Sequence, residues 1–434
     1  MKGLEMENQE KKVVEISRRD FLKTSALGTA ALLTGAASFA GGAWAAGSDE
    51  IRIGLVGCGG RGSGALMDAV NAAPGMKIVA LGDLFQDRLD GLYNGLTNNK
   101  GLKDKVALTK DKCFTGFDAY KRVIETDANY IILATPPGFR ATHLRYAVEH
   151  GKNVFAEKPV AVDAFGVRSV LESAGIAHWK KVGIVAGTQR RHEAKYVEAM
   201  KRIHDGAIGE IINGQCYWNQ GGLWMHQRQP QWSDMEWQIR NWLYFTWLSG
   251  DHICEQHVHN IDVINWAMNA HPVSAYGMGG RQVRTDPAYG HIFDHFTIQF
   301  DYPNGARVIS MCRQQDGTAG NVSEAVQGSK GTSNCCDWIK GANEWKFSGP
   351  NPGPYQQEHT DLINSIRAGK PLNEGIRIAD SCLTAIMGRM SAYTGQAITW
   401  EQALNSKEDT MPKELVLGPL PVPPVAVPGK TPFI

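Results

Sequence analysis

The chain lacks the features that mark several common classes of protein. Its eight cysteines include no C-x-x-C pair and no other zinc-type spacing, and the adjacent Cys335 and Cys336 are poorly placed for an ordinary disulfide. Lysine and arginine together number 45 against 44 aspartate and glutamate residues, and no basic block stands out. This balance of charge argues against nucleic acid and anionic lipid as partners. The cysteine spacing does not require a disulfide.

No apolar run has the composition of a convincing membrane span. The charge-free stretch 24–46 is rich in Ala, Gly and Leu, and it contains too many small residues and too many interruptions to form one. It follows Ser17-Arg18-Arg19-Asp20-Phe21-Leu22-Lys23 and closes with Ala43-Trp44-Ala45, a cleavage pattern. We predict that residues 1–46 are a twin-arginine signal peptide and that the mature protein is periplasmic or otherwise exported, with no stable membrane anchor. The alternative is a solvated basic N-terminus.

A glycine-rich loop follows the first predicted strand. The apolar run 51–56 leads into Gly57-Cys58-Gly59-Gly60-Arg61-Gly62, which opens a helical stretch at 63–71. Such glycines turn the chain tightly, admit a pyrophosphate close to the backbone and place a helix N-terminus near its negative charge. We predict a dinucleotide site that includes Gly57, Gly59, Gly60, Arg61 and Gly62.

The cofactor predicted for this loop is NAD. A second strand, 77–82, ends at Asp83, about twenty residues beyond the last glycine. A carboxylate there hydrogen-bonds the ribose hydroxyls of the adenosine and repels a 2′-phosphate. Arg88 follows shortly after and would favour that phosphate, so NADP remains the open alternative.

Two further strands lead to the same edge of the predicted parallel sheet. The run 130–134 continues into Thr135-Pro136-Pro137, and the run 153–156 continues into Glu157-Lys158-Pro159. Ligands of open α/β sheets lie beyond the carboxyl ends of the strands. We therefore assign Thr135, Pro136, Glu157 and Lys158 to the cofactor site, with the Lys158 ammonium meeting an alkoxide or carbonyl oxygen. The alternative is an ordinary surface lysine before a turn.

The order of the motifs GCGGRG, ATPP and AEKP resembles that of the Gfo/Idh/MocA family of oxidoreductases over residues 50–405. The resemblance implies a Rossmann domain with a doubly wound parallel sheet at 50–185 and a substrate-binding α/β domain at 186–405. It also implies that helices near 355–393 return to the first domain. In this family the lysine of Glu-Lys-Pro contacts the nicotinamide ribose and the reacting hydroxyl, which makes Lys158 a catalytic residue.

The second half of the chain has the pattern of an open, mostly antiparallel sheet followed by helices and a tail. Strands are predicted at 273–278, 291–300 and 306–311, and the alternation within the second of them predicts one buried face. The sequence Asp301-Tyr302-Pro303-Asn304-Gly305 is typical of a hairpin turn. Residues 406–434 are rich in proline and predict an extended arm, which the resemblance associates with homo-oligomers.

Aromatic and basic residues in the second half indicate a carbohydrate site. Six of the twelve tryptophans fall between Trp218 and Trp247, and flat indole faces suit the C–H faces of sugar rings. Trp242 is our candidate from this group, although core packing is the alternative for each of them. Arg190 and Arg191 are candidate contacts to substrate hydroxyls, with a solvated helix start as the alternative.

The densest polar cluster of the chain lies at residues 249–262. On a continuous helix Glu255, His259 and Asp262 share one face, and a carboxylate one turn from an imidazole orients the ring and raises its basicity. The cluster resembles the family pattern Asp-x-Gly-x-His-x-x-Asp, which makes Glu255 the acid and His259 the general base. Glu replaces Asp here, and His257 occupies the usual Gly. We assign Asp262 and His257 to the substrate site.

A metal ion is the competing interpretation of this cluster. His252, Glu255, His257 and His259 lie within eight residues and offer nitrogen and oxygen ligands. Two of these histidines are only two positions apart, so their side chains diverge on a helix. We therefore predict no metal.

Three functions are compatible with these residues. In the leading one, an NAD(P)-dependent oxidoreductase with tightly held cofactor, His259 removes a proton from a hydroxyl of a sugar, glycoside or cyclitol and Lys158 steadies the oxyanion. A redox-assisted glycoside lyase or hydrolase that never releases NAD is the alternative. The intact lysine and histidine disfavour a non-catalytic sugar-binding protein.

Overall fold

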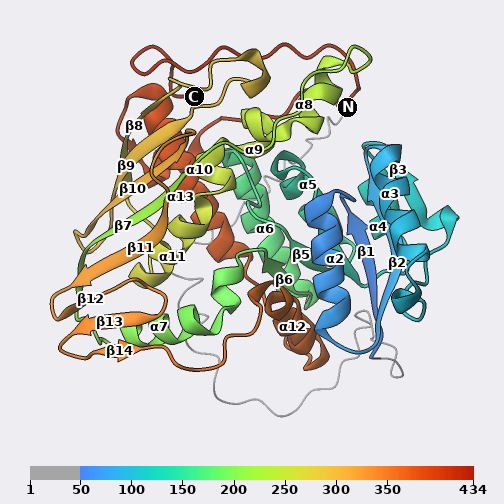
Figure 1. Ribbon diagram of the computed structural model, residues 1–434, viewed down its shortest axis with the longest axis horizontal. Coiled ribbons are helices and arrows are strands. Elements are labelled where there is room, and N and C mark those ends of the chain that lie inside the picture. Colours follow the sequence, from blue (N-terminus) through green and yellow to red (C-terminus); the bar gives the residue numbers. More distant parts are fainter. Residues whose placement is uncertain (1–48) are drawn as a thin grey trace, which may run out of the picture. The chain divides into compact units, whose positions relative to one another are not determined.

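The computed structural model describes residues 49–434, which form two β-sheets with helices packed on them (Figure 1). The blue to green part of the chain carries one sheet, and the yellow and orange strands belong to the other. The predicted signal peptide and its cleavage site lie outside the described residues. Within residues 49–434, no helix combines the length and the apolar character needed to cross a membrane.

The first sheet is parallel and has six strands in the order β3-β2-β1-β4-β5-β6. Its central strands are runs of buried apolar residues, as expected for a sheet covered on both faces. The strands are β1 Ile51–Val56, β2 Met76–Asp83, β3 Cys113–Thr115, β4 Tyr130–Leu133, β5 Asn153–Ala156 and β6 Ile184–Ala186. The strand order reverses between β1 and β4, which confirms the predicted doubly wound Rossmann fold.

Helices cover this sheet, and one of them comes from the far end of the sequence. They are α2 Gly60–Ala72, α3 Gln86–Thr97, α4 Ala119–Ile124, α5 Arg140–Glu149, α6 Ala164–Lys180 and α12 Pro354–Arg367. Helix α12 packs beside α2, and its Leu362 and Ile363 join the same apolar core as Ile53 of β1. A late segment of the chain therefore completes one face of the first sheet.

The second sheet is open and mostly antiparallel, as predicted, with nine strands in the order β14-β13-β12-β11-β7-β10-β9-β8-β15. Only β7 and β10 pair in parallel among these neighbours. The strands are β7 Ile211–Gln220, β8 Ser274–Gly280, β9 His295–Asp301, β10 Arg307–Gln314, β11 Asn321–Gly328, β12 Gly331–Ser333, β13 Trp338–Gly341, β14 Trp345–Lys346 and β15 Ile398–Thr399. Strands β8, β9 and β10 confirm the three predictions, although β9 begins later than residue 291. The sequence did not predict β7 or β11, the middle of this sheet.

Three helices pack on the inner face of the second sheet. They are α7 Ala194–His204, α11 Val258–Met268 and α13 Gly375–Thr394. Helix α13 contacts β8 on one side and α6 of the first half on the other, so it joins the two halves of the molecule (Figure 1). The domain limits at residues 185 and 405 stay predictions.

The predicted continuous helix through residues 255–262 is wrong. The chain forms α10, His252–Glu255, bends at Gln256, and begins again as α11. The amides of Gln256 and His257 both donate to the His252 carbonyl, which ends α10. Glu255 and His259 therefore stand on two different helices.

The proline-rich residues 406–434 contain no helix or strand and run along the surface of their own chain (red in Figure 1). The Met235 amide of α8, Asp234–Arg240, donates to the Gly418 carbonyl at 3.1 Å, and Gln238 Nε2 donates to the Leu420 carbonyl at 2.7 Å. The tail is extended and straps α8 to the rest of the molecule.

Candidate active site

A cleft of about 650 Å³ lies beyond the carboxyl ends of β1, β2, β4 and β5. Its walls come from the loops after these strands, from the segment 221–242, and from the junction of α10 and α11. The cleft brings together most of the predicted site residues, namely Gly57, Gly59, Gly60, Arg61, Gly62, Asp83, Thr135, Pro136, Glu157, Lys158, Trp242, Glu255 and His259.

The glycine loop is tight in two places and open in two others. Gly57 has φ +101°, a conformation that side-chain-bearing residues rarely adopt, and a Cβ on Gly62 would lie 1.8 Å from the Gly57 carbonyl oxygen. A Cβ on Gly59 or Gly60 would meet no atom within 4 Å. Helix α2 begins at Gly60, so its N-terminal amides and positive dipole end stand at this open space. The loop therefore fits the pyrophosphate of a dinucleotide.

Asp83 ends β2 on the wall of the same cleft. The Cys58 amide donates to Asp83 Oδ2 at 2.6 Å, and the Phe85 amide donates to Asp83 Oδ1 at 2.9 Å. Burial is the largest influence on this carboxyl and raises its pKa, against the effect of the two amide donors and of Arg88. Arg88 also lines the cleft, so the two residues that bear on the choice between NAD and NADP share one wall.

Arg61 is held by three carboxylates at the edge of the cleft. Its Nε pairs with Glu157, while Nη1 lies 3.6 Å from an Asp68 oxygen. Its Nη2 lies 3.7 Å from Oε1 of Glu358, a residue of α12 that the sequence did not reveal. Burial raises the pKa of Glu358 well above its usual value. The Arg61 guanidinium is therefore anchored on the first half of the molecule together with α12.

Lys158 meets Glu255 across the cleft. The Lys158 ammonium lies 2.8 Å from Glu255 Oε1 and also donates to the Glu255 backbone carbonyl. Their side chains are 15% and 12% exposed, so the pair is largely shielded from water. An ammonium has three N–H donors, and two of them are engaged by this one residue. The third is left for a ligand oxygen.

His259 lines this cleft with its imidazole ring. Its imidazole stacks on the Trp218 indole, with centroids 5.8 Å apart and planes inclined by 22°. Its Nδ1 is buried and has no hydrogen-bond partner among residues 49–434. Burial, followed by the positive charge of Lys158, lowers the pKa of His259 well below its usual value. The ring is therefore neutral at pH 7 and able to accept a proton. Glu255 binds Lys158, and no hydrogen bond joins it to His259.

The structure places four predicted substrate residues away from the cleft lining, each with a partner in the protein. Arg190 pairs with Glu324, and Arg191 Nε lies 2.8 Å from Asp262 Oδ2. His257 is fully buried, with its Nε2 2.7 Å from the Ser310 hydroxyl of β10. No sequence pattern predicts these pairs, because the partners are distant from one another in the chain.

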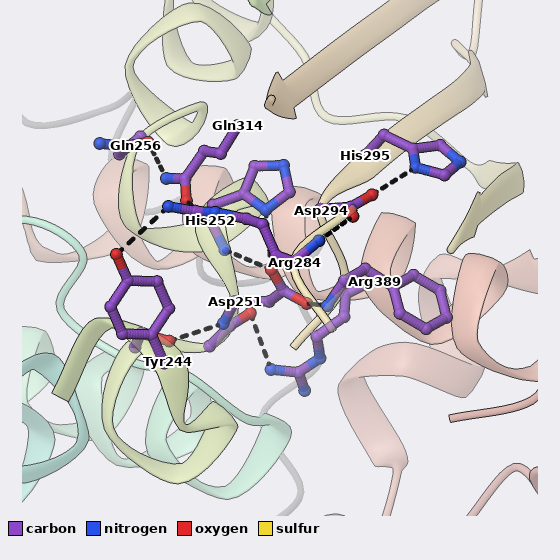
Figure 2. A network of polar contacts seen from close by, with 12 residues as sticks. Tyr244, Asp251, His252, Gln256, Arg284, Asp294, His295, Gln314 and Arg389 are labelled. Carbon is purple, nitrogen blue, oxygen red and sulfur yellow. Dashed lines mark hydrogen bonds and ion pairs between the residues drawn. The ribbon is translucent and has the colours of Figure 1, made fainter. Parts of the chain in front are cut away.

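A network of polar side chains supports the junction of α10 and α11 (Figure 2). Arg284 donates to Gln314 Oε1 and, at 3.2 Å, to the Tyr244 hydroxyl, and Gln314 Nε2 donates to Gln256 Oε1 at 2.5 Å. Gln256 Oε1 also accepts from Gln220 Nε2 at 3.3 Å. These contacts fix the orientation of the Gln256 amide, whose nitrogen points away from the network in Figure 2.

Asp251 anchors the start of α10 in the same network. It has φ +73° and is fully buried. Its carboxylate accepts from the amides of His252 and Phe293, the latter at 2.9 Å, and from the Tyr393 hydroxyl at 2.5 Å. These bonds from three residues hold an unusual backbone conformation four positions before the cleft residue Glu255.

Several cleft residues were not predicted from the sequence as site residues. They include Gln189, Trp224, His226, Arg240 and Tyr355. The stretch between Trp218 and Trp247 was expected at a carbohydrate site, but its individual contacts depend on the fold. Within residues 49–434 no group of three or more His, Cys, Asp or Glu side chains is placed to hold a metal ion.

Comparison with protein families gives three matches along the chain. Residues 51–180 match an oxidoreductase family with an NAD-binding Rossmann fold, and residues 196–333 match the GFO/IDH/MocA C-terminal domain. Residues 15–35 match the signal sequence of the twin-arginine translocation pathway. The two domain matches agree with the two sheets, and the third identifies an export signal.

Individual relatives are distant. Inositol 2-dehydrogenase 3 of Saccharopolyspora erythraea is 24% identical over 59% of this chain and 65% of its own length. The scyllo-inositol 2-dehydrogenase (NAD(+)) of Bacillus subtilis is 25% identical over 58% of this chain and 64% of its own. The chain thus spans less than two thirds of either relative. The structure of myo-inositol 2-dehydrogenase from Lactobacillus plantarum superposes with a TM-score of 0.62 at 21% identity, covering 81% of this chain and 99% of that one, and shows the shared fold.

Proposed function

Because the chain belongs to the Gfo/Idh/MocA family of oxidoreductases, we propose that it oxidises a hydroxyl group of a sugar, glycoside or cyclitol by hydride transfer. One observation carries the proposal. Lys158 and the imidazole of His259 line the same cleft as the open glycine positions of an NAD-binding loop. Two of the relatives are named as inositol dehydrogenases, which favours a polyhydroxylated ring as the substrate.

Each cleft residue has a role in this reaction. His259 accepts the proton of the substrate hydroxyl, since its ring is neutral and lines the cleft. Lys158 donates to the same oxygen and stabilises the negative charge that develops on it. Glu255 is a positioning residue that holds the Lys158 ammonium at 2.8 Å. The glycine loop and Asp83 would hold NAD, which would supply the acceptor for the hydride.

The cofactor preference rests on Asp83 and Arg88. Asp83 places a carboxylate where it repels a 2′-phosphate, so we propose that NAD is preferred over NADP. Asp83→Ser is expected to narrow the preference by at least about tenfold, measured as the ratio of dissociation constants for NADH and NADPH. An unchanged ratio would show that another residue determines the choice between NAD and NADP.

The test of the proposed reaction is a substrate screen with the purified protein. Inositols, aldoses and glycosides are each incubated with added NAD, and NADH formation is followed by absorbance. We expect NADH to accumulate with at least one of them and Lys158→Met to abolish it. Glycoside cleavage without net NADH would contradict simple hydride transfer and point to a redox-assisted cleavage.

We propose that the mature protein acts in the periplasm. The twin-arginine signal supports export of a folded chain, which allows the cofactor to be loaded before transport. Cell fractionation of the wild type and of a variant with Arg18 and Arg19 both changed to Lys tests this. The wild type is expected outside the cytoplasm, and the variant inside it.

We also propose a homo-oligomer. Tyr276 and Met278 of β8 are 56% and 65% exposed on the uncovered face of the second sheet, which offers apolar area to a second copy. Sedimentation measurements test this, and a monomer at all concentrations would contradict it.

A further inference from the structure

The adenosine end of the cleft is walled by both halves of the chain. In dinucleotide-binding sheets the acid at the end of the second strand marks the adenosine ribose, and here that acid is Asp83. Phe85 and Arg88 line the cleft just beyond it. The segment 221–242, which we call the clasp, contributes further lining residues to the same cleft, namely Trp224, His226, Ile239, Arg240 and Trp242.

The clasp is folded back on itself by contacts between its two ends. The Trp224 and Trp242 indoles pack at 5.8 Å with an interplanar angle of 63°. The His226 amide donates to Asn241 Oδ1 at 2.9 Å, and the Tyr244 hydroxyl donates to the Trp224 carbonyl at 2.8 Å. The aromatic side chains of the clasp therefore have fixed positions beside the cleft.

Arg240 ties the clasp to the first half of the molecule. Its two terminal nitrogens lie 3.0 and 3.1 Å from the two oxygens of Asp87 on α3. Its guanidinium carbon also lies 3.8 Å from the centroid of the Phe85 ring. The hydrogen bond from Arg240 is the largest influence that lowers the pKa of Asp87. The bridge thus joins a bidentate ion pair to a cation–π contact, immediately beyond Asp83 in the sequence.

The clasp is supported from behind by the C-terminal tail. Helix α8, which carries Arg240, donates hydrogen bonds to the tail carbonyls of Gly418 and Leu420. In return the Leu420 amide donates to the Asp234 carboxylate of α8. Arg240 also pairs with Glu236 of its own helix at 2.9 Å. The guanidinium is therefore preorganised for Asp87, because its helix is strapped and its own side chain is braced.

We propose that the clasp closes over the adenosine end of bound NAD and that the bridge between Arg240 and Asp87 limits the rate at which the dinucleotide leaves. A cofactor held in this way stays with the protein between turnovers. The proposal depends on NAD binding and is independent of the reaction that the protein catalyses.

Release of NADH from the purified, loaded protein tests the clasp directly. The complex is mixed with excess NAD, and loss of energy transfer from tryptophan to NADH gives the release rate without any substrate. Arg240→Ala is expected to speed release by about tenfold, the scale of a bidentate ion pair with a cation–π contact. Asp87→Asn removes only the ion pair and is expected to speed release by about threefold. The double variant is expected to release NADH no faster than the faster single variant, since both changes break the same bridge.

Arg228→Ala is the matched control. Arg228 belongs to the same clasp, but it pairs with Asp234 of its own segment at 2.6 Å and is 49% exposed. Its removal is expected to leave the release rate unchanged. Asp87 is 60% exposed on α3, so Asp87→Asn keeps the test valid if Arg240→Ala fails to fold. The proposal would be overturned if Asp87→Asn released NADH at the wild-type rate. It would also be overturned if Arg228→Ala released NADH as fast as Arg240→Ala.

Discussion

His257 and His259 stand two positions apart and belong to opposite sides of one segment. Burial lowers the pKa of both, so both are neutral at pH 7. His257 turns to the second sheet and bonds to Ser310, whereas His259 stacks on Trp218 and lines the cleft. The protonation state does not separate the two residues. The contrast lies in where each ring is placed, because His259 lines the cleft whereas Nε2 of His257 already bonds to Ser310 away from it.

Asp251 and Glu255 repeat this contrast. Asp251 accepts hydrogen bonds from several elements and is fully buried, whereas Glu255 turns to Lys158 at the cleft wall. The segment thus has a side that fixes the fold and a side that serves a ligand. If this division is correct, changes on one side act on stability and changes on the other act on activity.

The largest effect is expected at His259. His259→Asn removes the proposed base but keeps a polar side chain, so kcat/KM is expected to fall by about a thousandfold. The melting temperature is expected to change little, because the ring makes no hydrogen bond that would be lost. Steady-state kinetics and thermal unfolding measure the two effects. A large fall in melting temperature with normal activity would break the comparison.

Asp251→Ala is expected to act on stability instead. It leaves the donors from His252, Phe293 and Tyr393 without an acceptor and places alanine at φ +73°. The free energy of unfolding is expected to fall by about 3 kcal/mol. Urea titration measures it, with Asp118→Ala as a control because that side chain is 74% exposed. An equal loss in both variants would show that burial of the carboxylate is unimportant.

His257→Asn is expected to have a smaller effect of the same kind. It removes the bond to Ser310 and leaves space in the core, so the free energy of unfolding is expected to fall by about 1–2 kcal/mol. The value of kcat/KM measured on folded protein is expected to stay within about threefold of the wild type. A hundredfold loss would instead place His257 in the reaction.

The last effect appears only below pH 6.5, in the pH dependence of stability. Burial lowers the pKa of His257 from 6.5 to about 3, so between these values the unfolded chain binds a proton that the folded chain does not. This histidine therefore reduces stability as the pH falls from 6.5 toward 3, by about 1.4 kcal/mol per pH unit. The slope in His257→Asn is expected to be lower by that amount, measured by urea titration at several pH values. An unchanged slope would mean that His257 is protonated in the folded protein.

The first half of the molecule could be predicted because its signals are local. The strand before Gly57, the open loop and Asp83 lie within one short stretch, and parallel strands carry their carboxyl ends to a common edge. Lys158 was assigned on the same reasoning, and it lies in the cleft with the loop. The site at this edge therefore follows from consecutive elements.

The second half depends on contacts that sequence patterns do not encode. Strand β7 is central, but its neighbours β10 and β11 come much later in the chain, and its alternating burial is irregular. Arg191 and Asp262 are 71 positions apart, so no local sequence pattern around either residue revealed that they form an ion pair. The bend at Gln256 was not predicted for a similar reason. The hydrogen bonds that its side chain accepts from Gln314 and Gln220 form only when the chain folds.

The space around the glycine loop differs from one glycine to the next. Loop formation and nucleotide binding can therefore be disrupted separately. A methyl group at Gly62 collides with the backbone, so it would prevent the loop from forming. A methyl group at Gly59 would project into empty space and leave the loop intact, yet it would occupy room that the phosphates need. A substitution at Gly59 is thus expected to give a folded protein without its cofactor. Export of that variant would show whether the twin-arginine machinery requires only a folded chain or also a bound nucleotide.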